Sequence, residues 1–180
     1  MRFVVIEGTS REGRKSIHPA RYAVEKLEDK GHEADLFDVK QREIPFLGNR
    51  TYIEDENPVP EDVREFGELV ENADCVVIVS PEYNHSIPGA LKNALDHLYP
   101  EYEDKPFGYI TVSAGGFGGI RALDHLQDIT LGLGGVPGPS LQVSNVSDVF
   151  GTDGELLDES YRERFEVFIE EAERFAKKIK

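Results

Sequence analysis

The chain is poor in cysteine and has no long hydrophobic run, and each absence narrows what it can be. Cys75 is the single cysteine among 180 residues, so we expect no internal disulfide and a cytoplasmic location. No apolar run approaches the roughly 20 residues that a membrane-spanning helix needs. The apolar stretch at residues 3–6 is too short for the core of a signal peptide, and we expect a β-strand there.

Positive charge is also scarce. Lys and Arg total 20 against 35 Asp and Glu, which gives a formal net charge of −15. A nucleic-acid binder needs a basic face to replace counterions, so we expect no nucleic-acid partner. The acidic excess suits either a salt-rich cytoplasm or an ordinary acidic cytosolic protein, and composition does not choose between them.

Short runs rich in Val and Ile alternate with amphipathic segments along the whole chain. The predicted strands cover residues 3–6, 33–39, 75–79, 107–112 and 141–146. Apolar side chains at helical spacing predict helices near residues 17–27, 63–73, 88–98, 120–126 and 161–179. This alternation predicts an α/β fold with a doubly wound parallel sheet and right-handed crossovers. Its length suits a single domain over residues 1–180.

Two details qualify this pattern. The polar segment from Glu43 to Asn57 interrupts the alternation, and we expect a loop over one end of the sheet there. Cys75 opens the apolar run CVVIVS, which favours a buried, inert thiol over a reactive one.

The first loop, residues 8–16 with the sequence GTSREGRKS, follows the first predicted strand. In such folds ligands bind at the carboxyl ends of the strands. Hydroxyls and cations at the start of a helix favour a bound phosphate, since free N–H groups and the helix dipole attract anions. The alternative is a solvated turn in which Ser16 caps the helix. The loop is neither a Walker A sequence nor Gly-x-Gly-x-x-Gly, which weakens an ATPase or dinucleotide-fold dehydrogenase interpretation.

Two further loops follow the third and fourth predicted strands. The second loop, residues 80–89 (SPEYNHSIPG), offers the aromatic surface of Tyr83 and the amide of Asn84, which can pair with the edge of a heterocycle. Ordinary turn chemistry is the alternative, with Glu82 as a solvated charge. The third loop, residues 113–121 (SAGGFGGIR), has glycines that allow its backbone to approach a flat ligand closely. Its alternative is a flexible loop without a ligand.

Together the three loops resemble the NADPH-dependent FMN reductases, which include bacterial quinone, chromate and azo-dye reductases. SPEYNHSIPGALKNALDHLY at residues 80–99 is nearly the signature of that family. GTSREGRKS resembles its phosphate loop, with Thr9 where serine is commoner, and SAGGFGGIRALDHL resembles its third element. DGELLDE at residues 153–159 is similar to the family's entry to the final helix. The resemblance implies a flavodoxin-like three-layer sandwich, with a five-stranded parallel sheet of order 2-1-3-4-5 and helices on both faces.

The resemblance also implies the cofactor, FMN, and the co-substrate, NAD(P)H. The implied FMN-binding residues are Thr9, Arg11, Ser16, Pro81, Glu82, Tyr83, Asn84, Ser113, Ala114, Gly115 and Gly116. The first three would hold the phosphate, although the spacing between Arg11 and Ser16 varies in the family. The next four would line the isoalloxazine ring, and the last four would hold its other edge.

The implied activity is that of an oxidoreductase without a catalytic side chain, because the flavin carries the chemistry. Hydride would pass from the nicotinamide to the flavin, and electrons would continue to a quinone, an azo compound, a metal ion or free flavin. Family members are commonly dimers or tetramers, which would place Lys92, Asn93 and Asp96 near a partner subunit.

Other interpretations stay open at this stage. The main alternative is a flavodoxin-type electron carrier or a redox-sensing FMN-binding protein without NAD(P)H turnover. A hydrolase on the same sheet is disfavoured by the absence of Gly-x-Ser-x-Gly. His85 could contact substrate or lie on the surface, and the other histidines are too scattered to predict a metal site. Arg11, Arg14 and Lys15 could help bind the 2′-phosphate of NADPH, but the sequence does not choose between NADH and NADPH.

Overall fold

A computed structural model describes residues 1–48 and 59–179 of the chain. Its centre is a five-stranded parallel sheet of order β2-β1-β3-β4-β5. The strands are β1 (Arg2–Glu7), β2 (Glu33–Asp38), β3 (Cys75–Pro81), β4 (Pro106–Val112) and β5 (Val136–Val143). This confirms the flavodoxin-like fold and the strand order that the resemblance implied. Residues 49–57 of the predicted loop lie outside the described residues.

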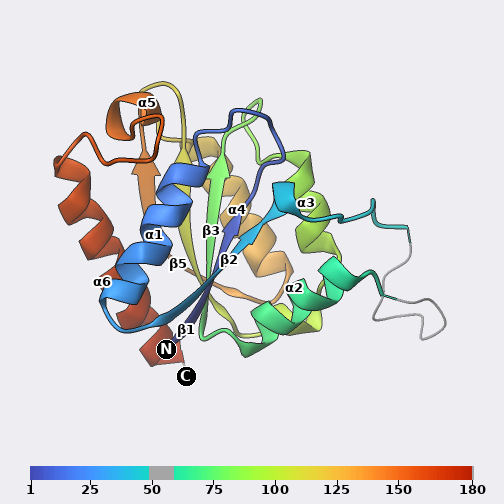
Figure 1. The fold of residues 1–180 in the computed structure, drawn as a ribbon. Helices are drawn as coiled ribbons and strands as arrows, with labels where there is room; N and C mark the ends of the chain where they lie inside the picture. Colours follow the sequence, from blue (N-terminus) through green and yellow to red (C-terminus); the bar gives the residue numbers. More distant parts are fainter. Residues whose placement is uncertain (49–58, 180) are drawn as a thin grey trace.

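Helices cover both faces of the sheet (Figure 1). On one face lie α1 (Ile17–Asp29) and α6 (Ser160–Ile179). On the other face lie α2 (Glu61–Asn72), α3 (Gly89–Asp96) and α4 (Ile120–Gly132). Three short helical turns connect the larger elements: η1 (Val39–Gln41), η2 (Pro100–Tyr102) and α5 (Val146–Val149).

The core consists of two apolar layers, one on each face of the sheet, because successive strand residues point to opposite faces. In β1, Phe3 and Val5 pack toward α1 and α6, and Val4 and Ile6 pack toward the other helices. Burying one such side chain stabilises the fold by about 1.5–3 kcal/mol. Cys75 lies in the layer that packs against α1 and α6. Burial raises the pKa of its thiol to about 12, as expected for an inert cysteine.

The last strand differs from its predicted position. We predicted a strand at residues 141–146, whereas β5 covers Val136–Val143 and Val146 begins α5. Pro137 and Pro139 hid the start of the strand because proline cannot donate to a ladder. They are tolerated here because β5 is an edge strand that pairs with β4 alone.

The second strand ends one residue earlier than predicted. The Asp38 carboxylate accepts a hydrogen bond from the Lys40 N–H at 3.1 Å and caps η1, which begins at Val39. Asp38 is also the register partner of Glu7 on β1, so two acidic residues end neighbouring strands side by side.

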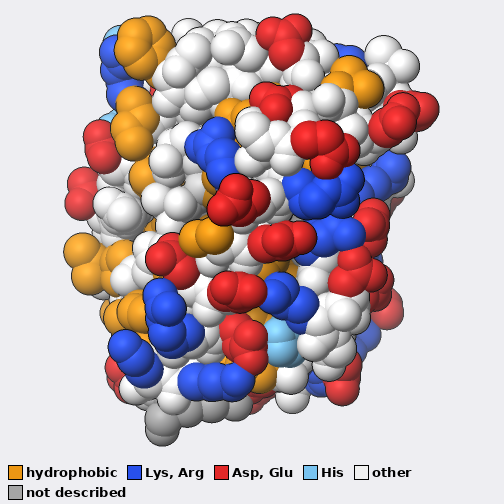
Figure 2. Space-filling view, turned by 90° about the vertical axis from the view of Figure 1, so that its left-hand side faces the viewer, with side chains coloured by type: hydrophobic (Ala, Val, Ile, Leu, Met, Phe, Trp, Pro, Cys, Tyr) orange, Lys and Arg blue, Asp and Glu red, His pale blue; other side chains and the backbone are white. Residues whose placement is uncertain are grey.

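The face formed by α1 and α6 carries interleaved acidic and basic side chains (Figure 2). Lys30 lies 2.8 Å from Glu170, and Lys26 lies 2.9 Å from Glu25. Exposed pairs of this kind contribute about 0–1 kcal/mol each. They therefore distribute the charge of the surface more than they stabilise the fold.

None of the described helices has the length and apolar character that crossing a membrane would require.

Candidate functional site

The three loops singled out in the sequence meet at the carboxyl edge of the sheet. They follow β1, β3 and β4, which are neighbours in the strand order. Because the strands are parallel, their carboxyl ends share one edge, seen at the top of Figure 1. This is where open α/β sheets bind ligands.

The first and second loops are joined by a hydrogen bond between two hydroxyl groups. Thr9 Oγ1 and the Tyr83 hydroxyl lie 2.6 Å apart, although 74 residues separate them in the chain. Thr9 is buried, and its Oγ1 also accepts the Arg11 N–H at 3.3 Å. The contact orients the start of the first loop and places Tyr83 beside it.

The second loop contains a tight two-residue turn at Asn84 and His85. Tyr83 N donates to Ser86 O at 2.8 Å and Ser86 N donates to Tyr83 O at 3.0 Å. Asn84 has φ 49° and His85 has φ 67°, so both adopt the left-handed conformation of a type I′ turn. Residues held in such backbone conformations cluster at ligand-binding sites. The turn leaves the side chains of Asn84 and His85 exposed at the rim.

Glu82 joins the second loop to the third. Its carboxylate accepts the Arg121 N–H at 3.2 Å, in the first turn of α4, and lies 3.5 Å from the Arg121 guanidinium. The Glu82 side chain is 14% exposed. It is therefore a helix-capping group, and the interpretation of Glu82 as a solvated charge is wrong. Pro81, the last residue of β3, leads directly into this contact.

The third loop is held by its own backbone and by the segment after β5. The Ser113 hydroxyl donates to Gly115 O at 2.6 Å and accepts the Gly118 N–H at 2.9 Å. Asn145 N donates to Gly115 O at 2.9 Å. A Cβ at Gly118, where φ is 62°, would lie 2.5 Å from Gln142 Cβ. These contacts give the loop one conformation, which only glycine permits at position 118.

Gly115 and Gly116 face open space. A Cβ added to either would meet no atom within 4 Å, and Ala114 beside them is exposed. The backbone of these residues can therefore be approached closely by a flat molecule. This feature is what a flavin ring requires, and it fits the predicted role of residues 114–116.

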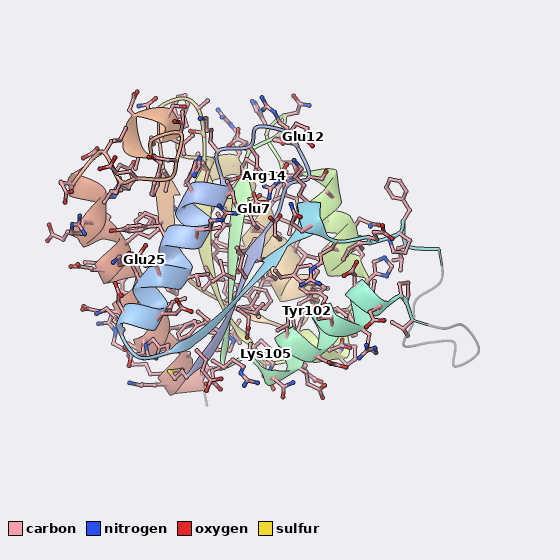
Figure 3. The ribbon with its side chains drawn as sticks, viewed as in Figure 1. Glu7, Glu12, Arg14, Glu25, Tyr102 and Lys105 are labelled. Carbon is pink, nitrogen blue, oxygen red and sulfur yellow. The ribbon has the colours of Figure 1, made fainter. Side chains whose placement is uncertain are left out.

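Beneath the first loop lies a buried charged cluster of Glu7, Arg14 and Asp38. Glu7 Oε2 lies 3.0 Å from Arg14 Nε, and the other end of the guanidinium pairs with Asp38. Glu7 Oε1 accepts the Ser16 hydroxyl at 2.5 Å. Glu7 is fully buried, and this burial is the main reason that its pKa rises to about 7. Figure 3 shows Glu7 and Arg14 near the carboxyl edge of the sheet, with Glu12 beyond them.

This cluster changes the interpretation of two first-loop residues. Ser16 stands at the N-cap position of α1, but its hydroxyl bonds to Glu7 and does not cap the helix. The Arg14 side chain is 9% exposed and forms ion pairs with two carboxylates. The suggestion that it binds a 2′-phosphate is therefore wrong. By contrast, within residues 1–48 and 59–179 no carboxylate pairs with the exposed guanidinium of Arg11. Arg11 is therefore a cation of this loop that is available to meet an anion, and Lys15 likewise forms no ion pair among these residues.

Sequence reasoning missed Glu7 and Asp38. Glu7 directly follows the first predicted strand and Asp38 lies near the end of the second, where a charge usually marks the approach to solvent. A signal existed: two acidic residues ending adjacent parallel strands lie side by side and require a cation, and the loop supplies several.

The residues predicted near a partner subunit lie on α3. Lys92 pairs with Asp96 at 2.7 Å, one helical turn away. Asn93 instead holds the segment after η1, accepting from Leu47 N at 3.0 Å and donating to Pro45 O at 2.9 Å. Their contact with a second subunit stays a prediction.

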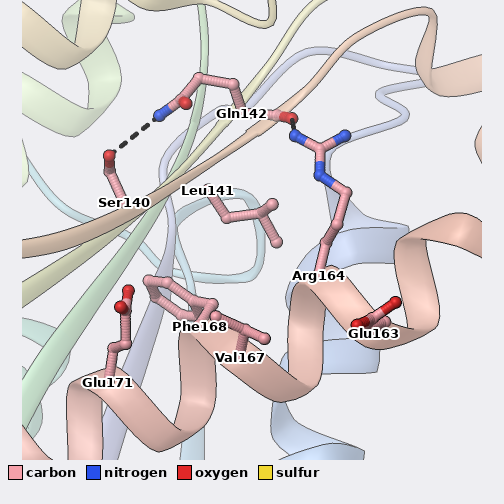
Figure 4. Close-up of a pocket in the computed structure, with 8 residues that line it drawn as sticks. All are labelled: Ser140, Leu141, Gln142, Glu163, Arg164, Val167, Phe168 and Glu171. Atoms are coloured by element: carbon pink, nitrogen blue, oxygen red, sulfur yellow. Dashed lines mark hydrogen bonds between the residues drawn. The ribbon is translucent and has the colours of Figure 1, made fainter.

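Among the hollows of the described residues, one lies between β5 and α6 and another borders the three-loop edge. A groove of about 320 Å³ separates β5 from α6, lined by Ser140, Gln142 and Arg164 among others (Figure 4). None of the predicted site residues lines it. A second hollow of about 390 Å³ reaches the first loop at Ser10 and is bounded by Phe46. Among the described residues no group of His, Cys, Asp and Glu side chains could hold a metal ion.

Fold and site together define a class: a flavodoxin-like protein with an exposed arginine in its first loop and an open glycine backbone in its third. The sequence profile of the NADPH-dependent FMN reductases matches residues 1–148. The chain belongs to the NADPH-dependent FMN reductase family, which confirms the resemblance found in the loops.

Relatives and solved structures agree with this assignment. An NADPH azoreductase of Bacillus sp. strain OY1-2 is 33% identical over 162 residues, 89% of this chain and 84% of that protein. An NAD(P)H:quinone oxidoreductase of Solanum tuberosum is 33% identical over 157 residues, 83% of this chain and 78% of that protein. The flavoenzyme FerB, an NAD(P)H:(acceptor) oxidoreductase of Paracoccus denitrificans, has the same fold. Its TM-score is 0.83 at 23% identity, covering 98% of this chain and 97% of FerB.

Proposed function

We propose that the chain binds FMN across the three loops and uses NAD(P)H to reduce small organic acceptors of the quinone or azo class. The observation that carries the proposal is the three-loop edge. There a cation that pairs with no described carboxylate and a buried hydroxyl lie at the same edge as an open glycine backbone. The names of the azoreductase and quinone oxidoreductase relatives support the choice of acceptors.

The first loop would hold the FMN phosphate. Thr9 would donate its hydroxyl, with its orientation set by Tyr83, and Ser16 would add a second hydroxyl. Arg11 would supply the positive charge at the start of α1, where N–H groups and the helix dipole already favour an anion.

The second and third loops would hold the isoalloxazine ring. Pro81, Glu82, Tyr83 and Asn84 would line it mainly through backbone atoms, and residues 113–116 would approach its other edge. Bound FMN supplies the redox chemistry, so no protein nucleophile is needed. Glu82 and Ser113 would act by holding the loops, because both are engaged in contacts within the protein.

The proposal extends to domain organisation, oligomeric state and location. Residues 1–180 act as a single FMN-binding domain. The protein is a homodimer or homotetramer, with Lys92, Asn93 and Asp96 near the interface. It works in the cytoplasm, where the buried free thiol of Cys75 is at no risk of oxidation to a disulfide.

The test is anaerobic reduction of the flavin-loaded protein. The purified chain is loaded with FMN, the excess is removed, and the visible spectrum is followed after NADPH or NADH is added. We expect flavin absorption that bleaches, followed by turnover with a soluble quinone and an azo dye. Flavin that stays oxidised with both nicotinamides would favour an electron carrier or sensor. A chain that retains no flavin would contradict the proposal.

In this assay Arg11→Ala tests the first loop, and Lys178→Ala is its matched control. Both changes remove an exposed cation, but only Arg11 lies on the first loop. We expect the first variant to lose FMN on gel filtration and the second to retain it.

A further inference from the structure

Glu7 lies directly behind the Ser16 hydroxyl, one of the two hydroxyls proposed to bind the phosphate. It is fully buried at the end of β1, and Ser16 is 2% exposed in front of it. Its Oε1 atom receives the Ser16 hydroxyl proton at 2.5 Å. Its Oε2 atom faces Arg14 Nε at 3.0 Å and the Thr9 N–H at 3.4 Å.

A count of donor protons shows a conflict at Ser16. A serine hydroxyl has one proton, and here Glu7 takes it. A phosphate dianion only accepts hydrogen bonds, so Ser16 cannot serve both groups while Glu7 is ionised. Thr9 has no such conflict: its oxygen accepts the Arg11 N–H, and when Tyr83 donates to it, its own proton is free for the phosphate.

The charges around Glu7 are also unbalanced. The charged groups that face Glu7 are Arg14 from the first loop and Asp38 from the end of β2. Two carboxylates therefore share one guanidinium, which leaves one buried negative charge behind the site of a dianion. A proton on Glu7 would neutralise the cluster.

We propose that Glu7 is a positioning residue that takes up a proton when the FMN phosphate binds, thereby releasing the Ser16 hydroxyl to the phosphate. This inference rests on the proposed FMN site. The proton comes from solvent and joins Glu7 Oε1. The new O–H donates to Ser16 Oγ, Ser16 donates to a phosphate oxygen, and Glu7 Oε2 keeps its contacts with Arg14 and Thr9.

The ionisation state of Glu7 before FMN binds permits this change. Burial raises the pKa of Glu7 to about 7, so its carboxylate is largely ionised at about pH 8. A phosphate monoester is already a dianion there, because its second pKa is about 6. Protons taken up at this pH therefore come to the protein and not to the ligand.

The experiment is calorimetric titration of the flavin-free protein with FMN at about pH 8, in two buffers of different ionisation enthalpy. The wild type should take up about one proton per FMN, and its affinity should fall about tenfold per pH unit above neutrality. Riboflavin, which lacks the phosphate, should bind without proton uptake. FMN binding without proton uptake would overturn the inference while leaving the proposed function intact.

Two variants sharpen the test. Glu7→Gln carries an amide that can donate to Ser16 and a carbonyl that can face Arg14, so it imitates protonated Glu7. It should bind FMN with an affinity that changes less than about twofold over the same pH range. Glu12→Gln also removes one carboxylate charge, from the adjacent first loop, but Glu12 is 89% exposed and pairs with Lys40, so it should keep the proton uptake of the wild type.

The remaining outcomes are also decisive. Equal pH dependence in Glu7→Gln and the wild type would overturn the inference. If Glu7→Gln does not fold, the proton count on the wild type still decides. Failure of FMN to bind at any pH would overturn the inference and the proposed function together.

Discussion

The first and third loops lie at the same edge of the sheet but are held in different ways. The first is anchored from below by buried charges, with Arg14 between Glu7 and Asp38. The third is anchored by hydrogen bonds of the Ser113 hydroxyl and of the backbone, and by Gly118, where a side chain would collide with Gln142. The first loop should therefore respond to charge and pH, and the third to side-chain volume.

The difference matches the two ends of the proposed ligand. A phosphate needs hydrogen-bond donors and compensating positive charge. A loop anchored by a buried ionic cluster can supply both. A flat ring needs space and backbone atoms at close range, which glycine supplies. Single substitutions can therefore change one anchor and leave the other intact.

The largest effect is expected from Arg14→Ala. It would leave Glu7 and Asp38 buried beside each other without their shared cation, which typically costs about 3–5 kcal/mol. The free energy of unfolding in urea at neutral pH measures the loss. Arg11→Ala, which removes an exposed arginine from the same loop, should change stability by less than about 0.5 kcal/mol. Equal losses in both variants would show that the cluster does not anchor the loop.

The next effect is a pH dependence of stability that comes from Glu7. The pKa of Glu7 is about 7 in the folded protein and near its ordinary value of 4.5 when unfolded. Between these values the folded state holds more protons, so the group lowers stability progressively as pH rises toward neutrality. Glu7→Gln lacks this titration. Its stability relative to the wild type should therefore increase by about 3 kcal/mol from pH 4 to pH 8.

Urea unfolding of both proteins across that pH range measures the difference. A constant difference would mean that Glu7 titrates normally. Glu12→Gln, at an exposed carboxylate in the adjacent first loop, supplies the baseline for removing a charge.

A smaller effect is expected in the third loop from Gly118→Ala. The new Cβ would lie 2.5 Å from Gln142 Cβ, at a φ of 62° that alanine rarely adopts. Such overpacking and backbone strain cost about 1–3 kcal/mol. Gly116→Ala is the matched control, because its Cβ meets open space. Thermal unfolding should separate the two, and identical melting temperatures would contradict the account of this loop.

The smallest effect is expected from Tyr83→Phe, which removes the hydrogen bond between the first and second loops. The loss of stability should be about 0.5–1.5 kcal/mol. Tyr22→Phe is the control, because the buried Tyr22 hydroxyl has no hydrogen-bond partner among the described residues. That change should be neutral or slightly stabilising. FMN affinity should fall in Tyr83→Phe alone, as a fluorescence titration would show.

Much of the fold could be predicted because the central strands are continuous apolar runs buried on both faces. The edge strand β5 was placed too late because Pro137 and Pro139 are unusual in a strand and are tolerated only where one side is unpaired. The sequence contains no direct sign of which strand is at the edge. The strand order came from the resemblance, and the structure confirmed it.

The candidate site was predictable as a set of loops but not as a set of contacts. The resemblance to the family implied the residues from Thr9 to Gly116, whereas the bond from Thr9 to Tyr83 joins positions 74 residues apart. The role of Glu7 depends on strand register, which places it beside Asp38. Register of this kind arises from tertiary packing, so the sequence offered only the indirect sign of acidic residues at the ends of two strands.

The most direct test of the account is a crystal structure of the protein with FMN. We expect the phosphate beside Thr9, Arg11 and Ser16. The ring should lie between the second loop and the backbone of Gly115 and Gly116. FMN bound elsewhere, for example in the groove between β5 and α6, would contradict the assignment of the three-loop edge as the flavin site.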